Sequence, residues 1–132
     1  MAEVKEDLWV YRVEDRTTGD GPYHNYNETD LRLELCDNHD GDSTHPGPYG
    51  EYWDEDVWRL HDARFGFISP EQLVTWFKGY LTELEDADYL VRVYNIKDAE
   101  HFISDYQCMF DMHYASLEDE MKISDLVKTS LV

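Results

Sequence analysis

The clearest hydrophobic pattern in the chain runs over residues 64–94. Residues 65–68 are typical of a short buried strand, and residues 89–96 are typical of a second one. Between them, apolar residues recur every three or four positions and predict a helix over residues 70–84. Ser69 is the predicted N-cap, because a proline follows it and a glutamine three positions later completes a capping box. This strand–helix–strand unit is the predicted core.

The rest of the chain shows weaker patterns. β-Branched and aromatic residues predict a strand over residues 8–14, and a second short strand is predicted over 106–111. Residues 15–26 are rich in turn formers and predict a loop. Residues 27–36 fit either an alternating strand or a short helix, and we favour the helix. Residues 116–127 predict a C-terminal helix, with a serine cap and acidic residues in the first turn.

Together these elements predict an α+β fold in a single domain spanning residues 1–132. We expect a small, mostly antiparallel sheet with one central packed helix and a C-terminal helix. Residues 37–56 predict a long acidic loop at the periphery, and loops of that length are usually functional or mobile. The four predicted strands are 8–14, 65–68, 89–96 and 106–111.

The composition favours a folded cytosolic protein. Hydrophobic residues make up 42% of the chain and aromatic residues 14%, which argues against disorder. No apolar run approaches the roughly 20 residues of a membrane span, and the N-terminus lacks the charged and apolar regions of a signal peptide. Cys36 and Cys108 are expected to be buried thiols, with a disulfide as the alternative.

The net charge narrows the choice of partner. Thirty acidic residues against eleven basic ones give a net charge of −19. A field of that sign repels nucleic acid and anionic lipid, so neither is an expected direct partner. Three explanations stay open: solubility, adaptation to high salt, and a surface that competes for a basic, nucleic-acid-binding protein.

Three acidic clusters are the candidate partner-binding sites. The second cluster lies at the C-terminal end of the predicted central helix, where anions oppose the helix dipole and cost stability. Nearby aromatic residues, Tyr52, Trp53 and Trp58, are candidate anchors for a partner. The clusters are Asp54, Glu55 and Asp56; Glu83, Glu85, Asp86 and Asp88; and Glu118, Asp119 and Glu120.

The sequence predicts no metal or cofactor site. His39, His45 and His61 lack the ligand spacing of zinc sites, and the loop around them does not fit a calcium-binding EF-hand. No serine-hydrolase motif is present, and with so many carboxylates an apparent acid–base pair carries little information.

Several short motifs resemble those of a type of small acidic protein found in phages and prophages. The resemblance covers about residues 9–110 and implies no particular activity. The motifs are Tyr11-Arg12-Val13-Glu14, Gly21-Pro22-Tyr23, His45-Pro46-Gly47-Pro48, Phe65-Gly66-Phe67-Ile68-Ser69, Trp76-Phe77, Tyr94, and Gln107 with Phe110.

The same order of residues resembles, more distantly, ADP-ribosyltransferases of the Arg-Ser-Glu kind. That resemblance implies that Arg12 would hold the phosphates of NAD and that Ser69 would close a strand of the site. Gln107 stands where the family has a glutamate, and it cannot serve as a general base. The resemblance therefore implies a degenerate form of that fold. The alternative readings are an arginine paired with a carboxylate, a helix cap, and an exposed strand residue.

From charge and resemblance we predict a non-enzymatic phage accessory protein in the host cytosol. It would bind a basic host protein, such as a nuclease, polymerase or defence component, as a DNA mimic or an anti-restriction or anti-CRISPR inhibitor. The alternatives are an NAD-using enzyme related to ADP-ribosyltransferases and an acidic soluble protein of a halophile. The oligomeric state stays open.

Overall fold

The first sheet is built on two buried antiparallel strands, β1 (Trp9–Asp15) and β3 (Tyr89–Asn95). The sequence predicts both to within one residue at each end. The third strand, β6 (Ser116–Met121), pairs with the other edge of β3 and gives the order β1-β3-β6. These elements come from a computed structural model that describes residues 6–23, 29–38 and 60–130.

A second sheet contains β2 (Ala63–Gly66), β5 (Cys108–Asp111) and β4 (His101–Ile103), in the order β2-β5-β4. The expected single sheet is therefore wrong, although the α+β fold class is confirmed. Strand β4, which is only three residues long, is not predicted from the sequence. The two sheets are linked where Tyr11 and Phe67 exchange backbone hydrogen bonds of 2.8 and 2.9 Å.

Gly66 allows the chain to pass from one sheet to the other. A Cβ atom at this position would overlap Cγ1 of Val10 and would lie 3.0 Å from the carbonyl oxygen of Tyr11. Only glycine permits so close an approach of the two backbones. The segment predicted as one strand at 65–68 therefore pairs with both sheets. Its first part belongs to β2, which ends at Gly66, and the next residue, Phe67, pairs with Tyr11 of the first sheet.

The helix predicted over residues 70–84 is two helices, α4 (Pro70–Trp76) and α5 (Leu81–Asp86). Ser69 caps α4 with its side chain, as predicted. The helix breaks before Gly79, whose φ of +92° lies in the left-handed region that favours glycine. The apolar spacing continues across the break, and this is why periodicity alone predicts one helix.

The predicted C-terminal helix over residues 116–127 is also wrong in its first half. That half forms strand β6, and α6 (Ile123–Ser130) begins only after it. The edge of β3 offers backbone groups that need a partner, and Arg92 of β3 binds Glu120 of β6 at 3.0 Å. Tertiary pairing therefore overrides the local helical pattern.

The ambiguous segment over residues 27–36 forms a helix, as favoured: α1 runs over Thr29–Asn38. Its Leu35 is fully buried against the core. The first two residues of the loop predicted over 37–56 belong to α1, and the rest of that loop lies outside the described residues.

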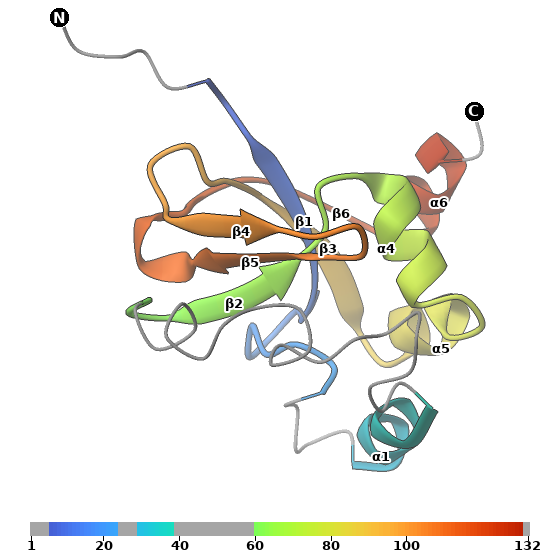
Figure 1. Cartoon of the computed structure of the whole chain (residues 1–132). Helices are drawn as coiled ribbons and strands as arrows, with labels where there is room; N and C mark the ends of the chain where they lie inside the picture. Colours follow the sequence, from blue (N-terminus) through green and yellow to red (C-terminus); the bar gives the residue numbers. More distant parts are fainter. Residues whose placement is uncertain (1–5, 24–28, 39–59, 131–132) are drawn as a thin grey trace, which may run out of the picture.

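β1 and β3 carry hydrophobic residues on both faces. On one face, Val13 and Tyr89 pack into a cluster that includes residues of α4, α5 and α6. On the other face, Val10 and Tyr94 pack against Phe110 of the second sheet. Figure 1 shows this arrangement, with the second sheet in front of the first and the three helices beside them. The fold is thus layered around β1 and β3.

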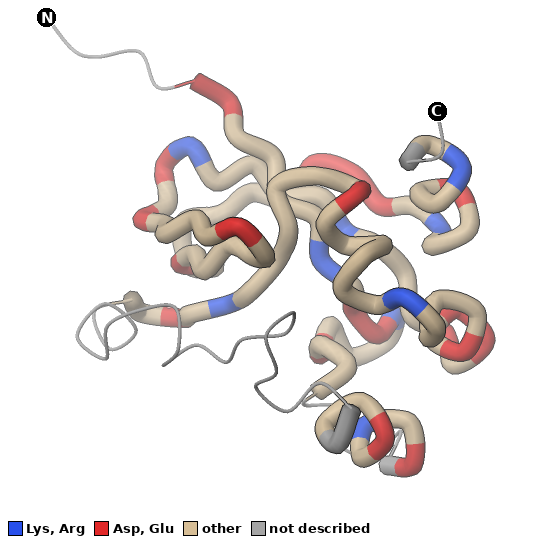
Figure 2. Tube along the Cα trace, turned by 45° about the vertical axis from the view of Figure 1, so that its right-hand side comes forward, with Lys and Arg blue, Asp and Glu red and all other residues tan. Residues whose placement is uncertain are grey.

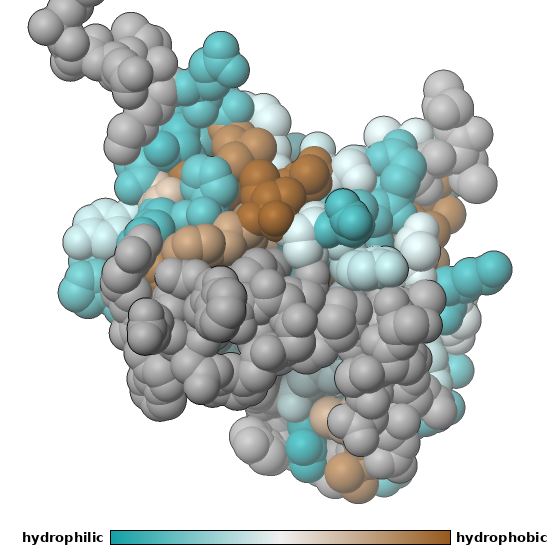
Figure 3. Space-filling model, in the orientation of Figure 1, coloured by the Kyte–Doolittle hydropathy of each residue, from teal (hydrophilic) through white to brown (hydrophobic). Residues whose placement is uncertain are grey.

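A smaller cluster lies on the outer side of the second sheet, where Leu60 and Met109 are buried beside partly buried Phe65 and Phe102. Figure 3 shows apolar side chains that reach the surface around β4, where Ile103 is 48% exposed. No helix in the described part of the chain is long and apolar enough to cross a bilayer.

Candidate functional site

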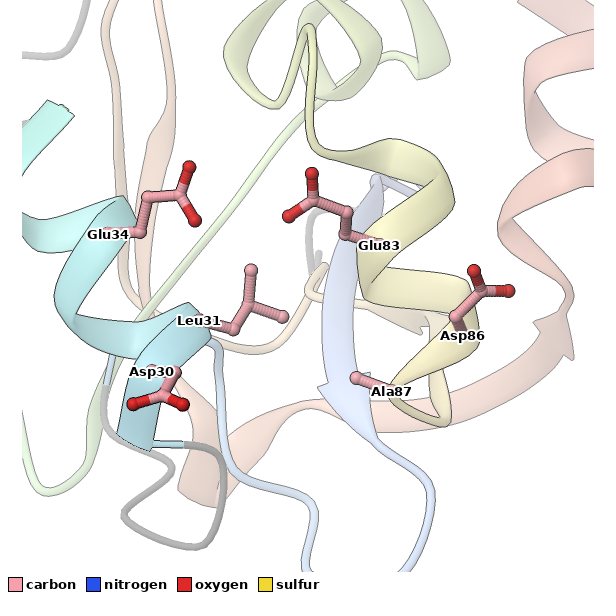
Figure 4. A pocket seen from close by; sticks show the side chains of 6 residues that line it. All are labelled: Asp30, Leu31, Glu34, Glu83, Asp86 and Ala87. Carbon is pink, nitrogen blue, oxygen red and sulfur yellow. The ribbon is translucent and has the colours of Figure 1, made fainter.

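A hollow of about 420 Å³ lies between α1 and α5, and we call it the α1–α5 pocket. In Figure 4, Glu34 of α1 and Glu83 of α5 point toward each other across the gap, and Leu31 lies between the two helices. Asp30 and Asp86 lie farther out, one on each helix. The lining residues are Asp30, Leu31, Glu34, Glu83, Asp86 and Ala87.

Helical spacing explains why the acidic residues share one rim. Asp30 and Glu34 are four residues apart, and Glu83 and Asp86 are three apart, so each pair projects from one side of its helix. Figure 2 shows acidic positions along both helices. Docking of α1 and α5 on the same core brings the two acidic sides together.

None of the four pocket carboxylates forms an ion pair within the described residues. Like charges at this helical spacing destabilise a helix by about 0.2–0.5 kcal/mol per pair. Leu31 and Ala87 add an apolar floor between the anions. Four anions around such a floor suit a cation carried on an aliphatic stem, which describes the side chains of lysine and arginine.

The second predicted acidic cluster lies on α5 and the turn that follows it, and it divides between pocket-lining and structural positions. Glu83 and Asp86 line the pocket, but Glu85 points to α6. Its Oε1 accepts hydrogen bonds from the backbone N–H of Ser124 at 3.0 Å and from the Ser124 hydroxyl at 2.9 Å. The backbone hydrogen bond from Ser124 lowers the pKa of Glu85. Glu85 therefore provides a hydrogen-bond acceptor for a free backbone N–H group in the first turn of α6.

Asp88 also has a structural role. Its carboxylate lies 2.8 Å from Nε of Arg16, and its backbone carbonyl accepts a hydrogen bond from the Arg16 N–H at 3.1 Å. Asp88 has a φ of +68°, so it makes the tight turn between α5 and β3. The Arg16–Asp88 ion pair thus joins that turn to the end of β1.

The third predicted cluster lies on β6. Glu120 binds Nε of Arg92 at 3.0 Å, Glu118 accepts a hydrogen bond from the Ser116 hydroxyl at 3.1 Å, and Asp119 accepts one from the Glu120 N–H at 2.9 Å. All three acidic side chains are exposed. This cluster is therefore separate from the pocket, none of whose lining residues belongs to β6.

The first predicted cluster, Asp54, Glu55 and Asp56, lies outside the described residues. The candidate aromatic anchors Tyr52, Trp53 and Trp58 lie outside them as well. These expectations stay predictions.

The residues of the distant ADP-ribosyltransferase resemblance each have a structural role. Arg12 donates to the carbonyl of Phe65 at 2.9 Å and to Glu14 at 2.7 Å, so it is paired but buried. Ser69 caps α4. Gln107 is buried, not exposed, and its backbone carbonyl accepts hydrogen bonds from Ser104 in the β4–β5 connection. The resemblance to ADP-ribosyltransferases is therefore not supported.

A buried charge network surrounds Glu14, which is 2% exposed. Its carboxylate accepts hydrogen bonds from Arg12 at 2.7 Å, Arg92 at 3.0 Å and the Tyr94 hydroxyl at 2.8 Å. Burial, followed by the hydrogen bond to Glu14, raises the pKa of Tyr94. Burial also lowers the pKa of Arg12. These three partners come from β1 and β3, so the network joins the two strands.

Sequence reasoning missed Asp30 and Glu34, which complete the pocket. Their spacing on a helix was the available signal, but the segment also fitted a strand. Nothing in the local pattern indicates that α1 packs beside α5. The pocket is a tertiary feature, because its two sides are far apart in the sequence: Glu34 on α1 and Glu83 on α5 are separated by 49 positions.

Neither cysteine forms a disulfide. Cys108 is buried and Cys36 half-buried, and burial raises the pKa of Cys108 to about 12. Within the described ranges, no group of three or more metal-ligating side chains is placed to hold an ion.

Comparison with known proteins gives a match to a protein family. The family model described as Bacteriophage T4 Y00F protein matches residues 1–124. No curated protein and no solved structure matches the chain. The resemblance to phage proteins is thereby confirmed at the level of the family.

Proposed function

The chain belongs to the Bacteriophage T4 Y00F protein family, and we propose that it is a non-enzymatic accessory protein that binds a basic protein of the host. In this proposal, a lysine or arginine side chain of the partner enters the α1–α5 pocket. The single observation that carries the proposal is the set of four carboxylates that surround an apolar floor and that form no ion pair with any residue the structure describes.

The pocket suits a basic side chain better than it suits a bare cation. The aliphatic stem of lysine or arginine would cover Leu31 and Ala87, while its charged end would lie between Glu34 and Glu83. Arginine has the advantage that its planar guanidinium can donate to more than one carboxylate at once. The repulsion among the carboxylates would be relieved on binding, and this adds to the affinity.

The net charge of −19 would act before contact is made. A field of that sign speeds the approach of a basic partner and weakens with rising salt. Proteins that bind nucleic acid carry the basic surfaces that such a field attracts. An occupied basic site would then be closed to nucleic acid, which gives the protein an inhibitory role in infected cells.

A pull-down from host lysate tests this function. The immobilised protein is loaded at low salt and eluted with a salt gradient, and duplex DNA is added as a competitor. We expect a basic nucleic-acid-binding protein that elutes as salt rises and that DNA displaces.

A pair of charge-matched variants locates the binding site. Glu34→Gln with Glu83→Gln removes two charges from the pocket, whereas Asp98→Asn with Asp105→Asn removes two exposed charges elsewhere. The pocket variant should lose the bound protein and the control should keep it. Equal retention by both variants would contradict a role for the pocket and would assign the binding to another part of the acidic surface.

A further inference from the structure

Strand β6 forms an open edge of the first sheet. It pairs with β3 on one side, and no strand within the described residues pairs with its other side. Residues Ser116 to Glu120 are all exposed, and Leu117 is 54% exposed. An open edge presents backbone N–H and C=O groups that can pair with an added strand.

The charges of β6 determine which strands can approach this edge. Glu118, Asp119 and Glu120 follow one another, and Glu120 is held by Arg92 at 3.0 Å. If two copies of the chain paired through β6, their acidic side chains would lie next to one another. The repulsion between these like charges disfavours such a dimer. A strand rich in lysine or arginine meets no such repulsion.

The register of β6 adds an apolar contact. Leu117 and Glu120 pair with Tyr94 and Arg92 of β3, and a register shift between Val93 and Tyr94 separates the two pairs. Because Tyr94 and Arg92 are two residues apart on one strand, Leu117 and Glu120 share one face of the sheet. An added strand could therefore contact an exposed leucine and a carboxylate on the same face.

We propose that the open edge of β6 binds an extended basic segment of a partner protein as an additional antiparallel or parallel strand. Backbone hydrogen bonds would supply the pairing, and the acidic side chains of β6 would select basic sequences. The inference takes the basic character of the partner from the proposed function. No β6 residue lines the α1–α5 pocket, so the two surfaces can be tested apart.

The test uses a capped eight-residue peptide that alternates arginine and valine. It is added to the Glu34→Gln, Glu83→Gln variant, in which the pocket no longer contributes. Hydrogen exchange of the β6 amides is measured with and without the peptide. A matched peptide, N-methylated at alternate residues, keeps the charge but cannot pair along one edge.

The unmodified peptide should slow exchange within β6 and should bind about tenfold more tightly than the N-methylated one, because several backbone hydrogen bonds are lost. Equal effects of the two peptides would mean that charge alone attracts them, and this would overturn the proposal. Unchanged exchange in β6 would overturn it as well. Protection of β6 that rises with protein concentration, without peptide, would assign the edge to a second copy and would also overturn it.

Variants of β6 test the role of its charges. Glu118→Gln with Asp119→Asn should weaken the unmodified peptide several-fold, while the fold, followed by circular dichroism, stays intact. Asp98→Asn with Asp105→Asn is the charge-matched control and should bind as before. Equal binding by both variants would contradict charge selection at the edge. If the peptide does not bind β6 but the pull-down still recovers a basic protein, the proposal for β6 is wrong and the proposed function is unaffected.

Discussion

The carboxylate of Glu14 lies 2.7 Å from the guanidinium of Arg12, and both side chains are buried. They are two residues apart on β1 and so share one face of the first sheet. Arg92 and Tyr94 of β3 approach the same carboxylate. One buried carboxylate thus pairs with two arginines, one on each central strand, and so joins β1 to β3.

Removal of that anion should be costly. Glu14→Ala leaves Arg12 buried without its counter-ion and should lower the free energy of unfolding by about 3–5 kcal/mol. Urea denaturation measures the change. The exposed substitution Asp105→Ala is the control and should change stability by less than about 0.5 kcal/mol. A loss at Glu14 no larger than that of the control would contradict the account of the network.

The raised pKa of Tyr94 predicts a loss of stability in alkali. The folded state holds the Tyr94 proton more tightly than the unfolded chain does, whose tyrosine pKa is about 10. The contribution is therefore fully present below about pH 10 and is lost as the pH rises above it. Tyr94→Phe should show a shallower decline of stability above pH 10 than the wild type, in denaturation curves measured at several pH values. Parallel curves would show that Tyr94 does not carry the effect.

The hydrogen bonds from Ser124 to Glu85 predict a role for Glu85 in the stability of α6. Glu85→Ala should cost about 1 kcal/mol, the usual size of a lost helix cap. Because the pKa of Glu85 is lowered, its contribution is present above the unfolded pKa of about 4.3 and is lost as the pH falls through the folded value. Glu83→Ala, two residues away, is the control and should not destabilise the protein.

The pocket should cost stability in the free protein. Glu34→Gln with Glu83→Gln relieves repulsion among four carboxylates and should raise the free energy of unfolding by a few tenths of a kcal/mol. The gain should shrink at high salt, where the repulsion is screened. Thermal unfolding at low and high salt checks both statements. A net loss of stability would mean that these carboxylates have stabilising partners.

The sequence predicts the elements that their own residues determine. The strands at β1 and β3 follow from β-branched and aromatic residues, and the start of α4 follows from the Ser69 cap. The prediction fails at Gly79, where a local left-handed turn breaks the helix although the apolar spacing continues. It also fails at β6, where a distant contact decides the structure, because β3 offers an edge.

The candidate site, like the fold, is only partly predictable from the sequence. In the sequence, Glu83 and Asp86 stand out because anions at the C-terminal end of the predicted 70–84 helix would be unfavourable. The structure corrects this reason for Glu83, which lies in the first turn of α5, where an anion is favourable. Their neighbours Glu85 and Asp88 share that signal, yet they bind Ser124 and Arg16 within the fold. The four residues are neighbours in the sequence, but the fold decides where each side chain points. Glu83 and Asp86 line the pocket, whereas Glu85 and Asp88 bind partners within the fold.

The central claim is that the α1–α5 pocket binds a basic side chain, and an NMR titration with N-acetyl-arginine amide tests it most directly. This small probe cannot add a strand to β6. We predict that backbone amide shifts gather on α1 and α5, disappear in the Glu34→Gln, Glu83→Gln variant and persist in the Asp98→Asn, Asp105→Asn control. Small shifts spread over the whole acidic surface, and equal in the two variants, would contradict the claim.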